Sequence, residues 1–337
     1  MLPDPTYATL DALRKRTKEP LSDRELVIIS DFGIQENSLD HDIGEFKLGG
    51  AEQHDSALVH YMSELLDKKV TSYRCPEVHP GLIQPENRYI ISNYTSLSPA
   101  VKEALQSYGN YVIYEHDHQY CSGRNPFVFP DMLVPLQAQL NVAFYAKAQA
   151  VVCMTRKHQE LLDSNIATRC TCNIGGTFYF QNELDFMEAL HKARLDKSIA
   201  KKRTADKKSV AAVYGHPHPL KGMHNSVRYC QAADIPFEVI EAKPTKKEFL
   251  EELAKFDRLV FLPLQPETCC RVVVEAMMIG ITVHTSSIVG ATGEPWYHSY
   301  DIGTKLIKEM GEPLRYRALS CVLDNLARVE DVTHSNT

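Results

Sequence analysis

Short apolar runs alternate with stretches of helical periodicity along most of this 337-residue chain. The first run is residues 25–31 (ELVIISD), and residues 51–69 follow it with apolar side chains at helical spacing. Similar runs recur in the first half of the chain at 70–75, 88–93, 111–115 and 150–154. Runs this short and continuous are typical of strands buried on both faces of a sheet. Their alternation with helices, which we expect at 98–107 and 135–147 among other places, predicts a parallel sheet.

The same pattern restarts after a change in composition. Residues 192–208 contain eight Lys or Arg against two Asp, whereas the whole chain has a net charge of −6. Runs typical of strands then recur at 210–214, 237–241, 258–264 and 281–285, and helices are predicted at 246–255 and 313–329. The length of the chain suits two domains. We therefore expect an N-terminal α/β domain over 1–190, a basic linker over 191–208 and a C-terminal α/β domain over 209–312.

Composition narrows the class of protein and its compartment. The chain is 44% hydrophobic and 24% charged, with a mean hydropathy of −0.28, and no apolar run reaches the length of a membrane span. The first twenty residues lack the basic-then-apolar layout of a signal peptide. Nine cysteines occur without a CxxC pair, a usage that indicates a reducing, cytoplasmic compartment. The net charge does not indicate a nucleic-acid partner, although a local basic patch can bind one.

Residues 265–295 carry the densest set of functional signals. Glu267 and Glu275 stand eight positions apart, and a strand and a loop containing Gly290 follow them. We place Glu275 in a helix and Glu267 in the loop that enters it. The N-terminus of a helix offers N–H groups and partial positive charge to a phosphate, and the Gly290 loop could add further N–H groups. Two carboxylates and an anion site match the parts of a nucleotide sugar; the alternative is an ordinary amphipathic helix with two solvated acids.

This stretch resembles the E-x7-E signature of retaining glycosyltransferases of the GT-B fold, the large group called family 4. The matching residues are Glu267, Cys269, Cys270, Val272, Val273, Val274, Glu275, Ala276 and Gly280. The resemblance implies two Rossmann-like domains facing a cleft, with the nucleotide-sugar donor, a UDP- or GDP-sugar, held mainly by the second. It implies that residues 313–337 form a helix that returns to the first domain. It also implies transfer of a hexosyl or pentosyl group to an acceptor hydroxyl with retention at the anomeric carbon.

The same resemblance assigns roles to individual residues. Glu275 would bind the ribose hydroxyls and Glu267 the transferred sugar. Lys221 and Gly222 match the loop that binds the donor diphosphate in the family, whereas Gly215 and His216 replace the Arg of that loop. Arg271 and a protonated His216 are candidates to supply the missing charge. For Lys221 alone, the alternative is a solvated lysine.

Two further candidate sites lie in the first half of the chain. Gly49 and Gly50 follow the first predicted strand, at the edge where α/β sheets bind ligands, and they resemble the N-terminal glycine loop of the same family. The alternative there is a flexible turn. Residues 115–118 (EHDH) directly follow another strand and have three interpretations: a metal site, a polar loop, or a site for the sugar or the acceptor. We favour the last, because the family carries a His there that contacts the sugar, and both His116 and His118 are candidates.

No metal is expected at the donor site, because Lys221 and helix N-termini can neutralise the phosphates. The acceptor is left open between a small molecule, a protein, a lipid and DNA. Hydroxymethylated bases in DNA are acceptors of phage glycosyltransferases, and the basic segment together with Arg124, Phe127 and Phe129 would suit such a polyanion. Two other classes stay open: a sugar-nucleotide epimerase of the same fold, and a non-catalytic protein that binds nucleotide sugars.

Overall fold

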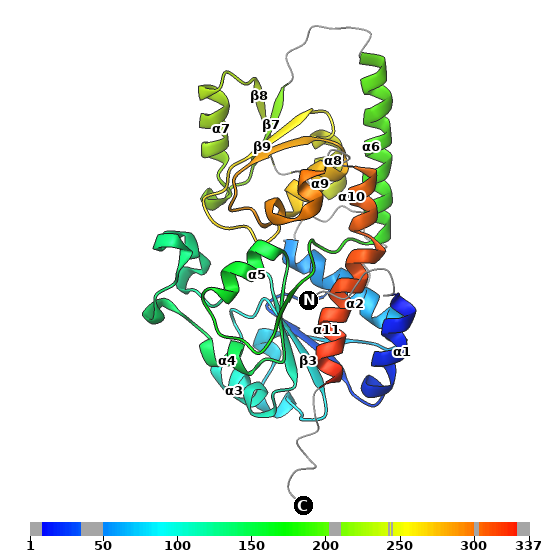
Figure 1. Cartoon of the computed structure of the whole chain (residues 1–337), viewed down its shortest axis with the longest axis vertical. Coiled ribbons are helices and arrows are strands. Elements are labelled where there is room, and N and C mark those ends of the chain that lie inside the picture. Colours follow the sequence, from blue (N-terminus) through cyan, green and yellow to red (C-terminus); the bar gives the residue numbers. More distant parts are fainter. Residues whose placement is uncertain are drawn as a thin grey trace, which may run out of the picture. The chain divides into compact units, whose positions relative to one another are not determined.

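The computed structural model describes residues 9–34, 50–201, 210–241, 243, 245–299 and 303–328 (Figure 1). Contacts divide these residues into two units. The first unit contains residues 9–34, 51–178 and 312–328, and the second unit contains the described residues of 179–311. Each unit is built on one parallel sheet with helices between successive strands. The prediction of two Rossmann-like α/β domains is therefore confirmed.

The sheet of the first unit has six strands in the order β2-β1-β3-β4-β5-β6. The strands are β1 (Leu26–Ser30), β2 (Thr71–Arg74), β3 (Arg88–Ser92), β4 (Tyr111–Glu115), β5 (Val151–Cys153) and β6 (Thr171–Asn173). Every residue of β1, β3 and β4 is buried, which explains why their sequences are continuous apolar runs rather than alternating ones. The strand β6 was not predicted, since its three residues are polar or small.

The helices of the first unit are α1 (Leu10–Leu21), α2 (Gly50–Leu66), α3 (Pro99–Tyr108), α4 (Val142–Lys147), α5 (Arg156–Asp163) and α11 (Glu312–Ala327). The helix expected over 135–147 is wrong in its first half. One 3-10 turn, Leu136–Ala138, lies there instead. Asn141, which precedes α4, has a left-handed φ of +55° that a continuous helix does not allow. The last helix, α11, packs on α1 through an ion pair of 2.7 Å between Arg16 Nε and Asp324 Oδ1.

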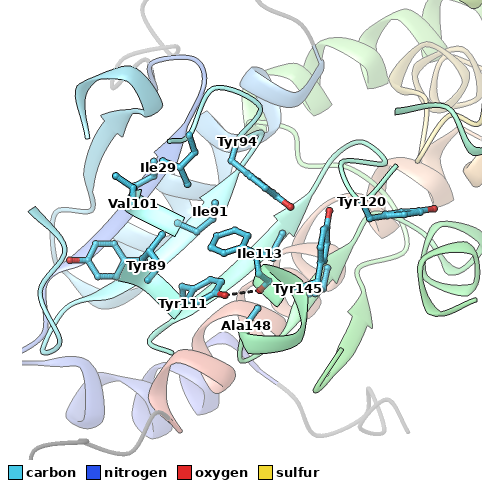
Figure 2. Close-up of a cluster of buried hydrophobic side chains, with 14 of the residues drawn as sticks. Ile29, Tyr89, Ile91, Tyr94, Val101, Tyr111, Ile113, Tyr120, Tyr145 and Ala148 are labelled. Atoms are coloured by element: carbon cyan, nitrogen blue, oxygen red, sulfur yellow. Dashed lines mark hydrogen bonds between the residues drawn. The ribbon is translucent and has the colours of Figure 1, made fainter. Parts of the chain in front are cut away.

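Tyrosines fill much of the core of the first unit (Figure 2). Tyr89, Tyr94, Tyr111 and Tyr145 are almost completely buried beside the apolar side chains of β1, β3 and β4. A buried phenol needs a hydrogen-bond partner. Tyr111 Oη donates to the carbonyl of Phe144 at 2.6 Å, which joins the core side of β4 to helix α4.

The second unit has four parallel strands in the order β10-β9-β7-β8. They are β7 (Ala211–Gly215), β8 (Phe237–Glu241), β9 (Arg258–Phe261) and β10 (Thr282–Thr285). Its helices are α6 (Gln181–Lys201), α7 (Met223–Ala232), α8 (Lys246–Leu253), α9 (Arg271–Met278) and α10 (Thr304–Glu309). The segment predicted as a basic linker, 191–208, begins inside α6, and its residues 202–208 lie outside the described part of the chain. None of the helices described is long and apolar enough to cross a membrane.

Gly222 joins β7 to α7 and tolerates no side chain. Its φ of +71° is left-handed, and an added Cβ would lie 1.8 Å from the carbonyl oxygen of Leu262. That atom belongs to the backbone that leaves β9, so it cannot move without disturbing the sheet. Gly222 therefore fixes how closely the loops after β7 and β9 approach each other.

We expect Gly222→Ala to lower the free energy of unfolding by at least about 2 kcal/mol, because left-handed strain adds to a backbone clash. Gly123→Ala is the matched control, since Gly123 has a φ of +73° but no atom within 4 Å of an added Cβ. The control should lose only about 1 kcal/mol from strain. Calorimetric unfolding measures both variants, and equal losses would show that the contact with Leu262 is unimportant.

Candidate functional site

The strand order of the second unit creates a switch point. The neighbouring strands β7 and β9 lie in the middle of the sheet. From β7 the chain continues outwards to β8, and from β9 it continues outwards to β10 in the opposite direction. Ligands of open α/β sheets bind at the carboxyl ends of the strands beside such a switch point. The loop after β7 contains His216, Lys221 and Gly222, and the loop after β9 contains Glu267. The sequence-predicted donor residues therefore come from the two loops that flank this position.

Lys221 and Glu267 form an ion pair that bridges these two loops. Lys221 Nζ lies 2.7 Å from Glu267 Oε1 and 3.0 Å from Oε2. Burial disfavours the ammonium charge, but the neighbouring Glu267 outweighs this effect and raises the pKa of Lys221. The alternative of a solvated lysine is therefore wrong, because the side chain is partly buried and paired with an acid. The pair places one lysine and one glutamate side chain beside the carboxyl ends of β7 and β9.

Main-chain hydrogen bonds hold the two loops together. Leu264 N donates to the carbonyl of Leu220 at 2.8 Å. Ser226 Oγ donates to the carbonyl of Gly222 at 3.1 Å and accepts from Leu262 N at 3.0 Å. The backbone of the loops after β7 and β9 thus fixes the position of Lys221.

The loop after β10 meets the loop that carries Glu267. Gly290 N donates to the carbonyl of Glu267 at 2.7 Å, and Glu267 N donates to the carbonyl of Ile288 at 3.2 Å. The prediction that this loop supplies N–H groups to phosphate does not hold for Gly290, since its N–H already bonds Glu267. Gly290 instead has a structural role, because it fixes the backbone that positions the Glu267 carboxylate.

Helix α9 places Glu275 in a buried, charged environment. The prediction that Glu275 lies in a helix and Glu267 in the preceding loop is confirmed. Glu275 is only 4% exposed. Its Oε1 lies 2.8 Å from Lys246 Nζ and 3.3 Å from Arg271 Nε. The alternative of two solvated acids is therefore wrong for this residue.

His216 and Arg271 were the two candidates to replace the missing Arg that binds the donor phosphates, and neither presents a free positive charge. Burial, Lys221 and His218 lower the pKa of His216, so its ring is neutral at physiological pH. The guanidinium of Arg271 bonds Glu275 and lies 4.2 Å above the ring of Tyr179. Lys221 is therefore the better-placed cation beside the switch point.

The two histidines after β4 have different environments. His116 Nε2 lies 2.7 Å from Asp55 Oδ1, and Ser92 Oγ donates to Asp55 Oδ2 at 2.7 Å. His118 is 1% exposed and packs edge-on against Tyr120 and His158. Burial lowers the pKa of His118 to about 4, which keeps its ring neutral. His118 is thus a core residue, and His116 is the better candidate for contact with a substrate.

The remaining predictions in the first half of the chain have less support. Gly50 is the exposed first residue of α2, and Gly49 lies outside the described residues. Asp117 Oδ2 pairs with Arg124 Nη1 at 2.9 Å, so the charge proposed for contact with DNA already has a counter-ion. Lys201 ends α6, and the rest of the basic run is not described. Across the described ranges, no group of three or more His, Cys, Asp or Glu could hold a metal ion.

Three ionisable residues of these sites were not predicted from the sequence. They are Asp55, Glu183 and Lys246, which the fold buries against partners that are distant in sequence. Only Lys246 had a local signal, because the Thr245 side chain caps α8 at the N–H of Glu248 and so marks where the helix begins. That signal gives no partner for the Lys246 ammonium.

Glu115, which directly precedes His116, generates a prediction about pH. Its carboxyl is buried, accepts hydrogen bonds from Tyr145 Oη and from Gln119 N, and has its pKa raised from 4.5 to about 8 by burial. The folded state therefore holds a proton that the unfolded state releases between these values. This stabilisation is present below pH 4.5 and is lost as pH rises towards 8.

The variant Glu115→Gln keeps a neutral side chain at every pH. Relative to wild type, its free energy of unfolding should increase as pH rises from 6.5 to 8, by up to about 1.4 kcal/mol per pH unit. This window avoids His118, whose opposite effect falls between its pKa of about 4 and the usual 6.5. Urea unfolding at several pH values measures the difference, and a difference that is constant with pH would contradict the buried proton.

Comparisons with known proteins give a limited result. No protein-family model matches the chain, and a search of curated proteins finds no significant match. HepE from Anabaena, solved in complex with UDP and glucose, is 14% identical over 92% of this chain and 96% of that chain, with a TM-score of 0.45. A glycosyltransferase from Rickettsia africae is 11% identical over 92% and 95%, with a TM-score of 0.45. An α,α-trehalose-phosphate synthase from Burkholderia vietnamiensis is 13% identical over 84% and 82%, with a TM-score of 0.42. TM-scores below 0.5 at such identities leave the functional assignment to the residues themselves.

Proposed function

We propose that this protein is a glycosyltransferase of the GT-B type that moves a sugar from a nucleotide-sugar donor to an acceptor hydroxyl. The observation that carries the proposal is the Lys221–Glu267 ion pair beside the switch point of the second unit. It combines a cation for a diphosphate with a carboxylate for sugar hydroxyls. The E-x7-E pattern from Glu267 to Glu275 supports the same assignment.

In this proposal the donor binds at the carboxyl ends of β7 and β9, the two central strands of the second sheet. Lys221 binds the diphosphate, which is a stronger anionic partner than one carboxylate. Glu267 then accepts hydrogen bonds from hydroxyls of the transferred sugar. Glu275, eight positions later in the same pattern, accepts hydrogen bonds from the ribose. Helix α7 begins next to Lys221, and its N-terminal N–H groups add to the field that stabilises the phosphates.

The chemistry proposed is transfer with retention of configuration. The bond between the anomeric carbon and the diphosphate oxygen breaks, and the acceptor oxygen attacks from the same face. The leaving diphosphate accepts the proton of the acceptor hydroxyl, so no side chain needs to form a covalent intermediate. The protein contributes orientation and electrostatic stabilisation of the leaving group, mainly through Lys221.

In the first unit, His116 is the residue assigned to the sugar or the acceptor. Asp55 holds the imidazole through Nε2, and Ser92 holds Asp55. Burial disfavours the imidazolium, but Asp55 outweighs this effect and raises the pKa of His116. His116 therefore combines a fixed orientation with a capacity for charge, both of which help to position a hydroxyl group.

The test is to incubate the protein with UDP- and GDP-sugars and a panel of acceptors, including DNA with hydroxymethylated bases, and to analyse products by mass spectrometry. The reaction should give glycosylated acceptor and free nucleotide in equal amounts, also in the presence of EDTA. Conversion of the donor without any acceptor would instead indicate an epimerase. Binding of the donor without release of nucleotide would indicate a non-catalytic binding protein.

The variant Glu275→Gln tests the ribose assignment. It replaces a charged acceptor with a neutral one, so the affinity for the donor should fall roughly tenfold, as expected for the loss of one charge-assisted hydrogen bond. Glu251→Gln is the control, because Glu251 is an exposed residue of α8. Titration calorimetry with the donor measures both. An unchanged affinity in Glu275→Gln would contradict the assignment.

A further inference from the structure

Four charged side chains from three helices of the second unit form one buried cluster. Lys246 Nζ of α8 lies 2.5 Å from Glu183 Oε1 of α6 and 2.8 Å from Glu275 Oε1 of α9. Arg271 of α9 reaches the same two oxygens, at 3.2 Å from Glu183 and 3.3 Å from Glu275. We call Glu183, Lys246, Arg271 and Glu275 the charge cluster. Its two cations and two carboxylates balance one another.

Tyr179 forms one wall of the charge cluster. Lys246 Nζ lies 5.1 Å from the centre of its ring, and the Arg271 guanidinium carbon lies 4.2 Å from it. The face of an aromatic ring attracts cations, most strongly where water is excluded. Tyr179 therefore stabilises both cations, which restricts where the ammonium and the guanidinium can lie.

Lys246 is the member of the charge cluster that ties the helices together. It is the first residue of α8 and only 5% exposed. A lysine is rarely buried to this extent unless it is paired, because removing an ammonium from water is costly. The shortest contacts of the cluster are the two that Lys246 makes, and they join α8 to α6 and to α9. Arg271 and Glu275, by contrast, lie one turn apart on the same helix.

We propose that Lys246 is a positioning residue for nucleotide-sugar binding, which holds the Glu275 carboxylate in one orientation. The inference rests on the proposed function, in which Glu275 accepts hydrogen bonds from the donor. A carboxylate buried without a partner would change rotamer to reach water. The short contact from Lys246 Nζ to Glu275 Oε1 prevents this change.

Glu183 has a different role in this arrangement. It bonds the two cations and lies on α6, outside the E-x7-E stretch. Burial alone would raise the pKa of Glu183, but Lys246 and Arg271 outweigh this effect and lower it. Glu183 is therefore the counter-ion that lets two cations surround Glu275 without leaving an unbalanced buried charge. Loss of Glu183 removes a partner of Lys246 but not the bond between Lys246 and Glu275.

The experiment compares Lys246→Met, which keeps length but removes charge, with Glu183→Gln and with Lys247→Met. Lys247 is the exposed next residue of α8 and serves as the control. Binding of UDP-glucose and GDP-mannose is measured by calorimetry, and stability by urea unfolding. Lys246→Met should bind the preferred nucleotide sugar at least about tenfold more weakly than wild type, because Glu275 loses its charge-assisted anchor. Lys247→Met should bind like wild type.

The variant Glu183→Gln separates positioning from simple destabilisation. It should lose stability comparable to that lost by Lys246→Met, since each leaves buried charge unbalanced, but its affinity should fall by less than about threefold. Affinity that falls in both variants in proportion to stability would overturn the proposal, as would unchanged affinity in Lys246→Met.

A ligand-free measurement keeps the proposal testable if wild type binds neither nucleotide sugar, a result that would count against the proposed function instead. In a crystal structure of Lys246→Met without nucleotide, the Glu275 side chain should leave the orientation that it has in a crystal structure of wild type. A carboxylate that keeps its place without Lys246 would show that other residues position it.

Discussion

The candidate site depends on the ion pair between Lys221 and Glu267, and this pair depends on two loops from neighbouring strands. The order β10-β9-β7-β8 brings the ends of β7 and β9 together, so residues 46 positions apart in sequence meet at 2.7 Å. Gly222 allows the loops to approach, since a side chain there would occupy the position of the Leu262 carbonyl. The position of the cation is thus a consequence of sheet topology and one glycine.

Electrostatic balance explains how the second unit can bury several charges beside this pair. Lys221 is matched by Glu267, and Lys246 and Arg271 are matched by Glu183 and Glu275. Removing one partner of such a pair costs more than the pair itself contributes, because the remaining charge stays buried. In the proposed function, a nucleotide diphosphate would replace Glu267 as the partner of Lys221. In the first unit, by contrast, burial keeps Glu115 protonated and His118 neutral, so these side chains carry no charge that needs a partner.

Continuous apolar runs identified the strands of both sheets except β6, and the E-x7-E spacing placed Glu275 in a helix and Glu267 before it. These features are local, so a sequence is sufficient to recognise them. The helix expected over 135–147 was partly wrong because Asn141 takes a left-handed conformation, so that α4 begins only at Val142. The strand β6 has no apolar run, since its three residues are partly exposed at the edge of the sheet.

The charge partners could not be predicted from the sequence for a physical reason. Lys246 and Lys247 are adjacent and identical, yet Lys246 is buried beside carboxylates of α6 and α9, whereas Lys247 is exposed with its ammonium over the ring of Phe186. The same holds for Asp55, which meets His116 only through the packing of α2 beside β4. Such pairings depend on which face of a helix is buried. That information arises from tertiary packing and not from any single segment.

The most direct test of the account is a crystal structure of the protein with UDP or GDP bound. The account predicts that the diphosphate lies within hydrogen-bond distance of Lys221 Nζ, at the carboxyl ends of β7 and β9, with the ribose hydroxyls on Glu275. Nucleotide bound elsewhere, with Lys221 still paired only with Glu267, would contradict it.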